Sequence, residues 1–444
     1  MIRKAIFILG HEIGDPSFYS NYQKFRKNQW RPFEELQRDQ EKELRALISF
    51  VYDQVPYYRT LFNDLKLQPR DIRTIEDLEK LPVLTKDIIK ADWDKFTPAN
   101  LSRQRYDARA TGGSTGAPMQ YRLSGHDRFL GVALLYRGWG YGGFELGDRM
   151  VFLAGSSLDT GSRSFVENKV HEVTRNIRKL SSFDMADAEM QQYADVFNSF
   201  QPRFLRGYAS SIYFYARWLK ENDVAVPALD AVFTAAEKLL PQMRKTIGEA
   251  FECEVYDNYG LNDGGLGAYE CSEHSGLHID SERGIMEIVD QQHRQIIEGE
   301  GEILATSLHN YAMPFIRYAT GDAGKIVDDT CPCGRHYPLL KEVLGRQQEM
   351  LITPEGKYVY GGFITHIFWQ FPHVKEFQVV QKEVNTLIFN IVPEPKFEMK
   401  EMEEMRLLLD SQGKGWGVEF RLVDEIDRSR GGKYKYIINE VAGA

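Results

Sequence analysis

The order of secondary-structure patterns along the chain is the feature that most constrains its fold. From about Tyr106, short strand-like segments are followed by longer stretches with helical spacing, for example 150–154, 204–206 and then 211–221. Strands that alternate with helices predict an α/β domain built on mixed sheets.

A different pattern begins near Gly345 and Arg346. It comprises a hairpin, two more strands, an amphipathic helix and a last strand, at residues 349–353 with 357–360, 375–382, 385–392, 397–411 and 417–422. This order predicts a small α+β domain over residues 346–444, after a large domain over residues 1–345.

The charge balance and the apolar runs limit the partners of the chain. Its 444 residues carry 55 Lys+Arg and 64 Asp+Glu, a net charge of −9, which argues against nucleic acid as a partner. No run approaches the about 20 apolar residues of a membrane-spanning helix. The apolar stretch 5–9 ends before any signal-peptide cleavage site, so we expect a cytoplasmic protein. A homodimer is left open.

A glycine-rich loop lies between two strand-like segments, 106–110 and 119–123. It reads Thr111-Gly112-Gly113-Ser114-Thr115-Gly116-Ala117-Pro118. Glycines let backbone N–H groups approach phosphate oxygens, and hydroxyls can add hydrogen bonds. The loop has no lysine and runs into a strand, so it is not a Walker A loop. Taken alone, it indicates either phosphate binding or an ordinary hairpin turn.

Five further segments follow the loop in a recognisable order. They are Ala235-Ala236-Glu237, Tyr256-Asp257-Asn258-Tyr259-Gly260-Leu261-Asn262-Asp263, Arg317-Tyr318-Ala319-Thr320-Gly321-Asp322, Gly345-Arg346-Gln347-Gln348-Glu349-Met350 and Arg430-Gly431-Gly432-Lys433. Together with the loop, they resemble the motifs of the adenylate-forming superfamily, which includes acyl-CoA synthetases, peptide-synthetase adenylation domains and luciferases. The resemblance implies that the small C-terminal domain is mobile.

Three other segments narrow the resemblance. They are Val55-Pro56-Tyr57-Tyr58-Arg59, Leu81-Pro82-Val83-Leu84-Thr85-Lys86 and Arg206-Gly207-Tyr208-Ala209-Ser210. They resemble phenylacetate-CoA ligase-like proteins and their capsular-polysaccharide-biosynthesis branch, from about residue 36 to the end. This implies a ligase that uses ATP and Mg²⁺ to adenylate a carboxylic acid, such as phenylacetate, and then transfers the acyl group to CoA. The alternatives are an amine or hydroxyl acceptor in envelope polysaccharide synthesis, or a non-catalytic nucleotide-binding scaffold.

The resemblance assigns ATP and AMP to a set of positions. They are Thr111, Gly112, Gly113, Ser114, Thr115, Gly116, Ala236, Glu237, Asp257, Asn258, Tyr259, Gly260, Asp322 and Arg346. The loop would hold the β- and γ-phosphates, and Tyr259 would stack on adenine. Asp322 would accept hydrogen bonds from both ribose hydroxyls, since a carboxylate is a good acceptor for a vicinal diol.

The resemblance makes Lys433 the catalytic residue, because a flexible ammonium suits charge that develops between the carboxylate and the α-phosphate. Lys435 is the alternative, although only Lys433 follows the glycine pair. Two positions depart from the family. Asp263 stands where Glu is usual and would place Mg²⁺, or else serves as a turn or helix-cap residue. Gln348 replaces an acidic hinge residue.

The cysteines suggest a second site. Three of the four cysteines in the chain, Cys271, Cys331 and Cys333, could join His278 in a closed tetrahedral site for structural Zn²⁺. The Cys-x-Cys spacing is tighter than usual, so reduced buried thiols are the alternative. Similar segments in some phenylacetate-CoA ligase-like proteins favour zinc, and favour His278 over His274.

The identity of the acid is left open by the sequence. The aromatic run from Tyr136 to Tyr141 suits either an aryl acid or a packed core. Arg137, within that run, suits a uronic or other polar acid.

Overall fold

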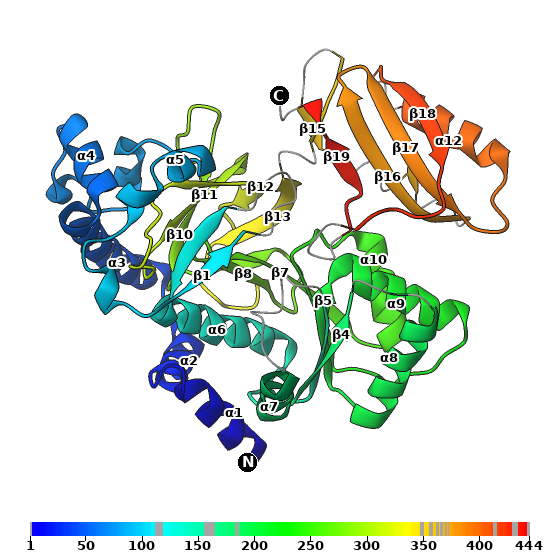
Figure 1. The fold of residues 1–444 in the computed structure, drawn as a ribbon, viewed down its shortest axis with the longest axis horizontal. Helices are drawn as coiled ribbons and strands as arrows, with labels where there is room; N and C mark the ends of the chain where they lie inside the picture. The colour runs from blue at the N-terminus through cyan, green and yellow to red at the C-terminus, as the bar shows by residue number, and fades with distance from the viewer. Residues whose placement is uncertain are drawn as a thin grey trace. The chain divides into compact units, whose positions relative to one another are not determined.

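Strands β3 (Met150–Ala154) to β13 (Leu339–Arg346) form one large sheet in the larger of two structural units (Figure 1). The computed structural model describes residues 2–111, 119–154, 165–182, 185, 187–346, 350–354, 358–360, 364, 367–368, 371, 373–411, 415–428 and 434–441. The units are Met1–Val343 and Leu344–Ala444. The first is α/β with a mixed sheet and the second is α+β, so the predicted fold class is confirmed.

The first unit begins with α1 (Ile2–Glu12), α2 (Phe18–Asn28), α3 (Phe33–Gln54), α4 (Pro56–Asp64), η1 (Pro69–Asp71), η2 (Glu76–Lys80), α5 (Lys86–Ala91), η3 (Trp93–Phe96) and η4 (Leu101–Arg103). Next come β1 (Tyr106–Ala110), β2 (Gln120–Ser124), α6 (Gly125–Trp139), η5 (Gly140–Gly142), β3 (Met150–Ala154), α7 (Phe165–Arg175), β4 (Ile177–Ser181), α8 (Asp187–Phe200), β5 (Phe204–Tyr208), α9 (Ala209–Glu221), β6 (Ala231–Ala235) and α10 (Pro241–Phe251). The remaining strands are β7 (Glu254–Leu261), β8 (Leu266–Glu270), β9 (Leu277–Ile279), β10 (Gly284–Val289), β11 (Gly299–Ser307), β12 (Tyr318–Val327) and β13 (Leu339–Arg346).

The main sheet has eleven strands in the order β10-β11-β12-β13-β9-β8-β7-β6-β5-β3-β4. Strands β4, β3, β5, β6 and β7 are parallel, and β7, β8 and β9 are antiparallel neighbours. In open sheets of this kind, ligands bind beyond the carboxyl ends of the parallel strands. The predicted strands beside the glycine-rich loop form the β1–β2 hairpin.

Helices cover both faces of the parallel strands. Helices α8, α9 and α10 lie on one side, and α6 and α7 on the other (Figure 1). Helices α1 and α2 lie before residue 36, where the family resemblance begins. An aromatic core joins these two helices to α6 and contains Phe7, Phe18, Tyr22, Phe25, Phe129, Tyr136 and Trp139. The run around Tyr136 is therefore core packing. Among the described residues, no helix has the length and apolarity needed to cross a bilayer.

The second unit has its own core. Its elements are β14 (Met350–Ile352), β15 (Tyr358–Tyr360), β16 (Val374–Glu383), β17 (Thr386–Pro393), α12 (Met399–Ser411), β18 (Gly417–Leu422) and β19 (Ile437–Asn439). Strands β14 and β15 form the predicted hairpin, and β18-β17-β16-β19 form a sheet. Phe368 stacks on Phe377 and Phe389, with ring centroids 4.5 and 5.1 Å apart.

Candidate functional site

Residues at the carboxyl end of β6 and in β7 form the predicted adenine edge. Ala236, directly after β6, has a φ of 67°. The carboxylate of Glu237 accepts a hydrogen bond of 2.9 Å from the backbone N–H of Ser210, at the start of α9. Glu237 therefore holds the loop after β6 against the start of α9, which is a structural task that the sequence did not indicate.

Asp257 of β7 is held from several sides. The hydroxyl of Thr234 donates to its carboxylate at 2.7 Å, and the backbone N–H of Asn258 donates at 2.9 Å. Its own N–H donates to Glu270 at 2.7 Å. Burial raises the pKa of Asp257 to about 6, with a smaller contribution from the charge of Glu270. The side-chain oxygen of Asn258 is buried without a hydrogen-bond partner among the described residues, so an acceptor is available at this edge.

We expect Asp257→Asn to gain stability relative to the wild type as the pH rises. The carboxyl has a folded-state pKa near 6, above its ordinary 3.8, so it favours folding while protonated and loses that contribution as the pH rises through about 6. An amide does not titrate. The difference in free energy of unfolding between variant and wild type should therefore grow by on the order of 2 kcal/mol between about pH 4 and pH 7. Urea denaturation at both pH values measures it, and a constant difference would contradict the raised pKa.

Tyr259 and Asp322 meet although they are 63 residues apart in the sequence. The hydroxyl of Tyr259 donates to the carboxylate of Asp322 at 2.9 Å. Burial raises the pKa of Tyr259 well above its ordinary range, with the charge of Asp322 as the next cause. The backbone N–H of Asp322 donates to the Thr320 hydroxyl at 3.0 Å, which orients the start of this segment. The two residues predicted for adenine and ribose thus lie in one place.

Asp263 lies close to this pair, in the turn between β7 and β8. Its carboxylate accepts a hydrogen bond of 2.9 Å from the hydroxyl of Tyr318. Burial raises the pKa of Asp263, and the charges of Lys86 and Asp322 act on it in opposite directions. The Lys86 ammonium donates to the carbonyl of Thr320 at 3.3 Å.

The sequence did not assign Lys86 and Tyr318 to the site. Both belong to segments that carried the family resemblance, and this was the only available signal.

Several predicted positions lie outside the described residues. These are Gly112, Gly113, Ser114, Thr115, Gly116, Gln348, Lys433 and the side chain of Arg346. Thr111 is described, and its hydroxyl accepts a hydrogen bond of 3.0 Å from the backbone N–H of Met119. The contacts of the glycine-rich loop with phosphates and the catalytic role of Lys433 therefore stay predictions from the sequence.

The structure brings the four predicted metal ligands together. One ligand atom from each of Cys271, His278, Cys331 and Cys333 lies within 4.8 Å of the others. The sulfur atoms of Cys271 and Cys331 are 3.6 Å apart, and Nε2 of His278 lies 3.3 and 3.4 Å from the sulfurs of Cys271 and Cys333.

The donor set and its spacing fit zinc. Bond lengths of about 2.3 Å to sulfur and 2.0 Å to nitrogen place the ligand atoms of a tetrahedral site roughly 3.5–3.8 Å apart. Burial lowers the pKa of His278 to about 3, so its imidazole is neutral, as a metal ligand requires.

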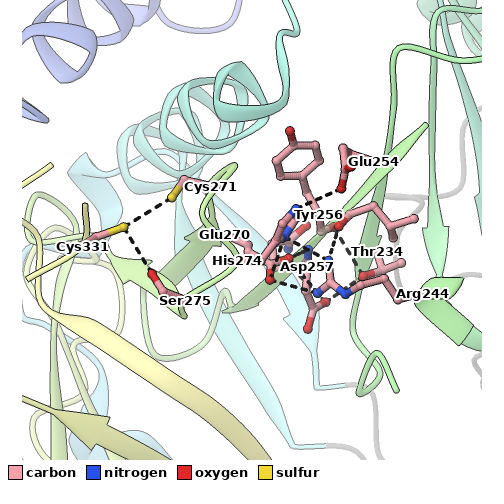
Figure 2. Close-up of polar contacts among 12 residues, drawn as sticks. Thr234, Arg244, Glu254, Tyr256, Asp257, Glu270, Cys271, His274, Ser275 and Cys331 are labelled. Atoms are coloured by element: carbon pink, nitrogen blue, oxygen red, sulfur yellow. Dashed lines mark hydrogen bonds and ion pairs between the residues drawn. The ribbon is translucent and has the colours of Figure 1, made fainter. Parts of the chain in front are cut away.

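His274 takes part in a different group (Figure 2). Its ring nitrogens lie 3.2 Å from a carboxylate oxygen of Glu270 and 3.1 Å from one of Glu254. Arg244 contacts both carboxylate oxygens of Glu270 at 2.9 Å. Since Glu270 also accepts from the backbone of Asp257 and directly precedes Cys271, this ion-pair group lies between the cysteine cluster and the adenine edge.

Comparisons with known proteins agree with this architecture. Residues 351–440 match the family described as CapK C-terminal domain. Phenylacetate-coenzyme A ligase of Thermus thermophilus is 26% identical over 364 residues, 80% of each chain. Protein CapK of Staphylococcus aureus is 24% identical over 416 residues, 90% of this chain and 89% of that protein.

Solved structures match along most of the chain. A 2-hydroxyisobutyryl-CoA ligase, crystallised in the postadenylation state with an acyl-AMP, aligns with a TM-score of 0.74 at 18% identity and covers 94% of this chain and 92% of its own. The anthranilate CoA ligase AuaEII aligns with a TM-score of 0.56 at 17% identity and covers 73% and 64%. The homologues are therefore phenylacetate-CoA ligases and CapK, and the fold is that of adenylate-forming CoA ligases.

Proposed function

We propose that this chain is an ATP- and Mg²⁺-dependent ligase that adenylates a carboxylic acid, in the class of aryl acids such as phenylacetate, and transfers the acyl group to CoA. The observation that carries the proposal is the meeting of Tyr259, Asp322 and Asp263 at the edge of the sheet. The relatedness to phenylacetate-CoA ligases supports it. ATP and CoA are cytoplasmic metabolites, so we place the enzyme there.

In this reaction a carboxylate oxygen of the acid attacks the α-phosphorus of ATP, and the bond to pyrophosphate breaks. Asp322 would accept the ribose hydroxyls, and the glycine-rich loop would hold the β- and γ-phosphates. Lys433 would stabilise the negative charge around the α-phosphate. Mg²⁺, when bound near Asp263, would neutralise phosphate charge. The thiol of CoA then attacks the acyl carbon, and AMP leaves.

The domain arrangement belongs to the proposal. A small domain over residues 346–444 would deliver Lys433 for adenylation and then rotate, so that CoA reaches the adenylate. The hinge would lie at Arg346 and Gln348. Gln348 in place of an acidic residue is compatible with this, because a hinge absorbs backbone rotation and needs no charge.

ATP–pyrophosphate exchange tests the proposed first step. Exchange that depends on one class in a panel of aryl, fatty, amino and uronic acids would support adenylation and name the class. No exchange with any acid, despite measurable ATP binding, would favour a non-catalytic scaffold.

An acceptor other than CoA is the second candidate. The match of residues 351–440 to the CapK C-terminal domain, and the likeness to CapK over 90% of the chain, favour an amine or hydroxyl acceptor in envelope polysaccharide synthesis. Exchange without CoA-dependent release of AMP would select this candidate.

We propose that the cysteine cluster holds a structural Zn²⁺. Protein purified without a histidine tag should contain about one zinc per chain by mass spectrometry, and Cys331→Ser should lose it. Because metal binding contributes to folding free energy, the unfolding temperature should fall by about 5 °C or more. Cys253→Ser, which changes a cysteine outside the cluster, is the matched control. Wild-type protein with far less than one zinc would refute the site.

A further inference from the structure

Two arginines on the side of the sheet covered by α6 differ in how their charge is balanced. The side chain of Arg137 is fully buried and forms an ion pair with Asp280. It also donates to the hydroxyl of Tyr337 at 2.7 Å. The sequence suggested Arg137 for a polar acid, but its guanidinium is already paired within the protein. Arg206 of β5 forms no ion pair or hydrogen bond with any residue that the structure describes, and its Nε is buried.

Arg206 belongs to a row of side chains that crosses the parallel strands. It is in register with Phe152 of β3 and Phe233 of β6, and Phe233 is in register with Tyr256 of β7. Registered residues of parallel strands point to the same face of a sheet. The guanidinium carbon of Arg206 lies 4.9 Å from the ring centre of Trp139 and 5.6 Å from that of Phe152. Arg206 is thus a partly buried cation in an aromatic setting.

The aromatic rings only partly compensate for the missing counter-charge. A cation–π contact stabilises a cation by less than the free energy lost when the cation is removed from water without a partner. Burial accordingly lowers the pKa of Arg206 to about 10. An anion that arrives with a ligand would remove this cost, and the same aromatic rings would favour a flat carbon skeleton beside the charge.

The position of Arg206 relates it to the proposed active site. It lies two residues before the carboxyl end of β5, the sheet edge at which ligands of such folds bind. Its row of side chains runs through Phe233 to Tyr256 of β7, and Asn258, two residues further along β7, lies on the same face of the sheet at the adenine edge. An acid that reacts with the α-phosphate beside the adenine edge could therefore extend toward Arg206.

We propose that Arg206 binds a second negatively charged group of the acid, so that the substrate is an aryl-type acid carrying a carboxylate, sulfate or phosphate besides the reacting carboxylate. The inference rests on the proposed adenylation. It makes Arg206 a residue that determines specificity, because a neutral acid would leave the guanidinium unpaired.

Matched pairs of acids test this directly. Pyrophosphate exchange is measured with 2-, 3- and 4-carboxyphenylacetate, each against the methylphenylacetate that carries its methyl group at the same ring position. The wild type should prefer at least one carboxy acid over its methyl partner by about tenfold or more in kcat/KM, and Arg206→Met should lower that ratio about 10- to 100-fold, mainly through KM. Arg206→Lys, which keeps a cation, should retain most of the preference.

Arg178→Met is the matched control, because Arg178 of β4 is also stacked, 4.5 Å from the ring centre of Phe200. Its register partner Val151 directly precedes Phe152, so Arg178 lies on the opposite face of the sheet and its loss should not change the ratio. An unchanged ratio in Arg206→Met would overturn the proposal. An equal loss for both members of each pair would also overturn it, since Arg206 would then hold the reacting carboxylate or support the fold.

A binding measurement separates failure of this inference from failure of the proposed function. If no acid supports exchange, adenylation of these acids is refuted, and the shift in unfolding temperature caused by each acid still reports on Arg206. A shift produced by a carboxy acid in the wild type and lost in Arg206→Met would support the anion site. No shift in the wild type would overturn it.

Discussion

Replacing Lys433 by alanine is expected to lower the rate of acyl-adenylate formation by a factor of about 100 to 1,000 or more. The ammonium would stabilise negative charge that is larger in the transition state than in bound ATP, so its loss should act on kcat. The affinity for ATP, measured by calorimetry, should change by less than about threefold, because the triphosphate would be held mainly by the glycine-rich loop. Pyrophosphate exchange at saturating ATP and acid measures the rate.

Two comparisons make the assignment of Lys433 specific. Lys435→Ala should keep nearly full activity, because Lys433, and not Lys435, directly follows the glycine pair of the family motif. Synthetic acyl-adenylate given to Lys433→Ala should still react with CoA at close to the wild-type rate, because the second half-reaction would not use this lysine. Full exchange activity in Lys433→Ala would refute the assignment.

Replacing Asp322 by alanine is expected to raise the KM for ATP about 100-fold or more. A carboxylate that accepts from both ribose hydroxyls makes two charge-assisted hydrogen bonds, and each contributes roughly 1.5 to 3 kcal/mol. Initial rates over a range of ATP concentrations measure the change, which should also appear in the dissociation constant of AMP.

The neighbour of Asp322 supplies a control for this prediction. Tyr259→Phe removes the hydroxyl that donates to Asp322 at 2.9 Å but keeps an aromatic ring for adenine. Its effect on the KM for ATP should stay below about tenfold, since the variant keeps the carboxylate that would accept from the ribose. A larger effect for Tyr259→Phe than for Asp322→Ala would place the ribose elsewhere.

Local signals predicted most of the secondary structure. The β1–β2 hairpin and the β14–β15 hairpin follow from alternating segments that flank glycine and proline turns, and both pair as expected. Strand β19 was missed, because three residues give no measurable alternation. Helices α1 and α2 were also missed. Their aromatic residues are buried by contacts with α6, which is distant in the sequence, so the local pattern does not identify them as core residues.

Contacts between distant segments were harder to predict. The sequence named the three cysteines and His278, yet their proximity depends on β9 pairing with β13, which places His278 opposite Leu339. Likewise, nothing local distinguishes Arg137 from Arg206. Asp280, which neutralises the first, is 143 positions away in the sequence.

The cover that α1 and α2 provide for α6 has a practical consequence for recombinant versions of this protein. The family resemblance starts near residue 36, which makes that point an attractive start for a shortened chain. Such a chain would leave Phe129 and Tyr136 facing water, and exposed aromatic patches of this kind promote aggregation. Soluble expression should therefore require that both N-terminal helices be retained.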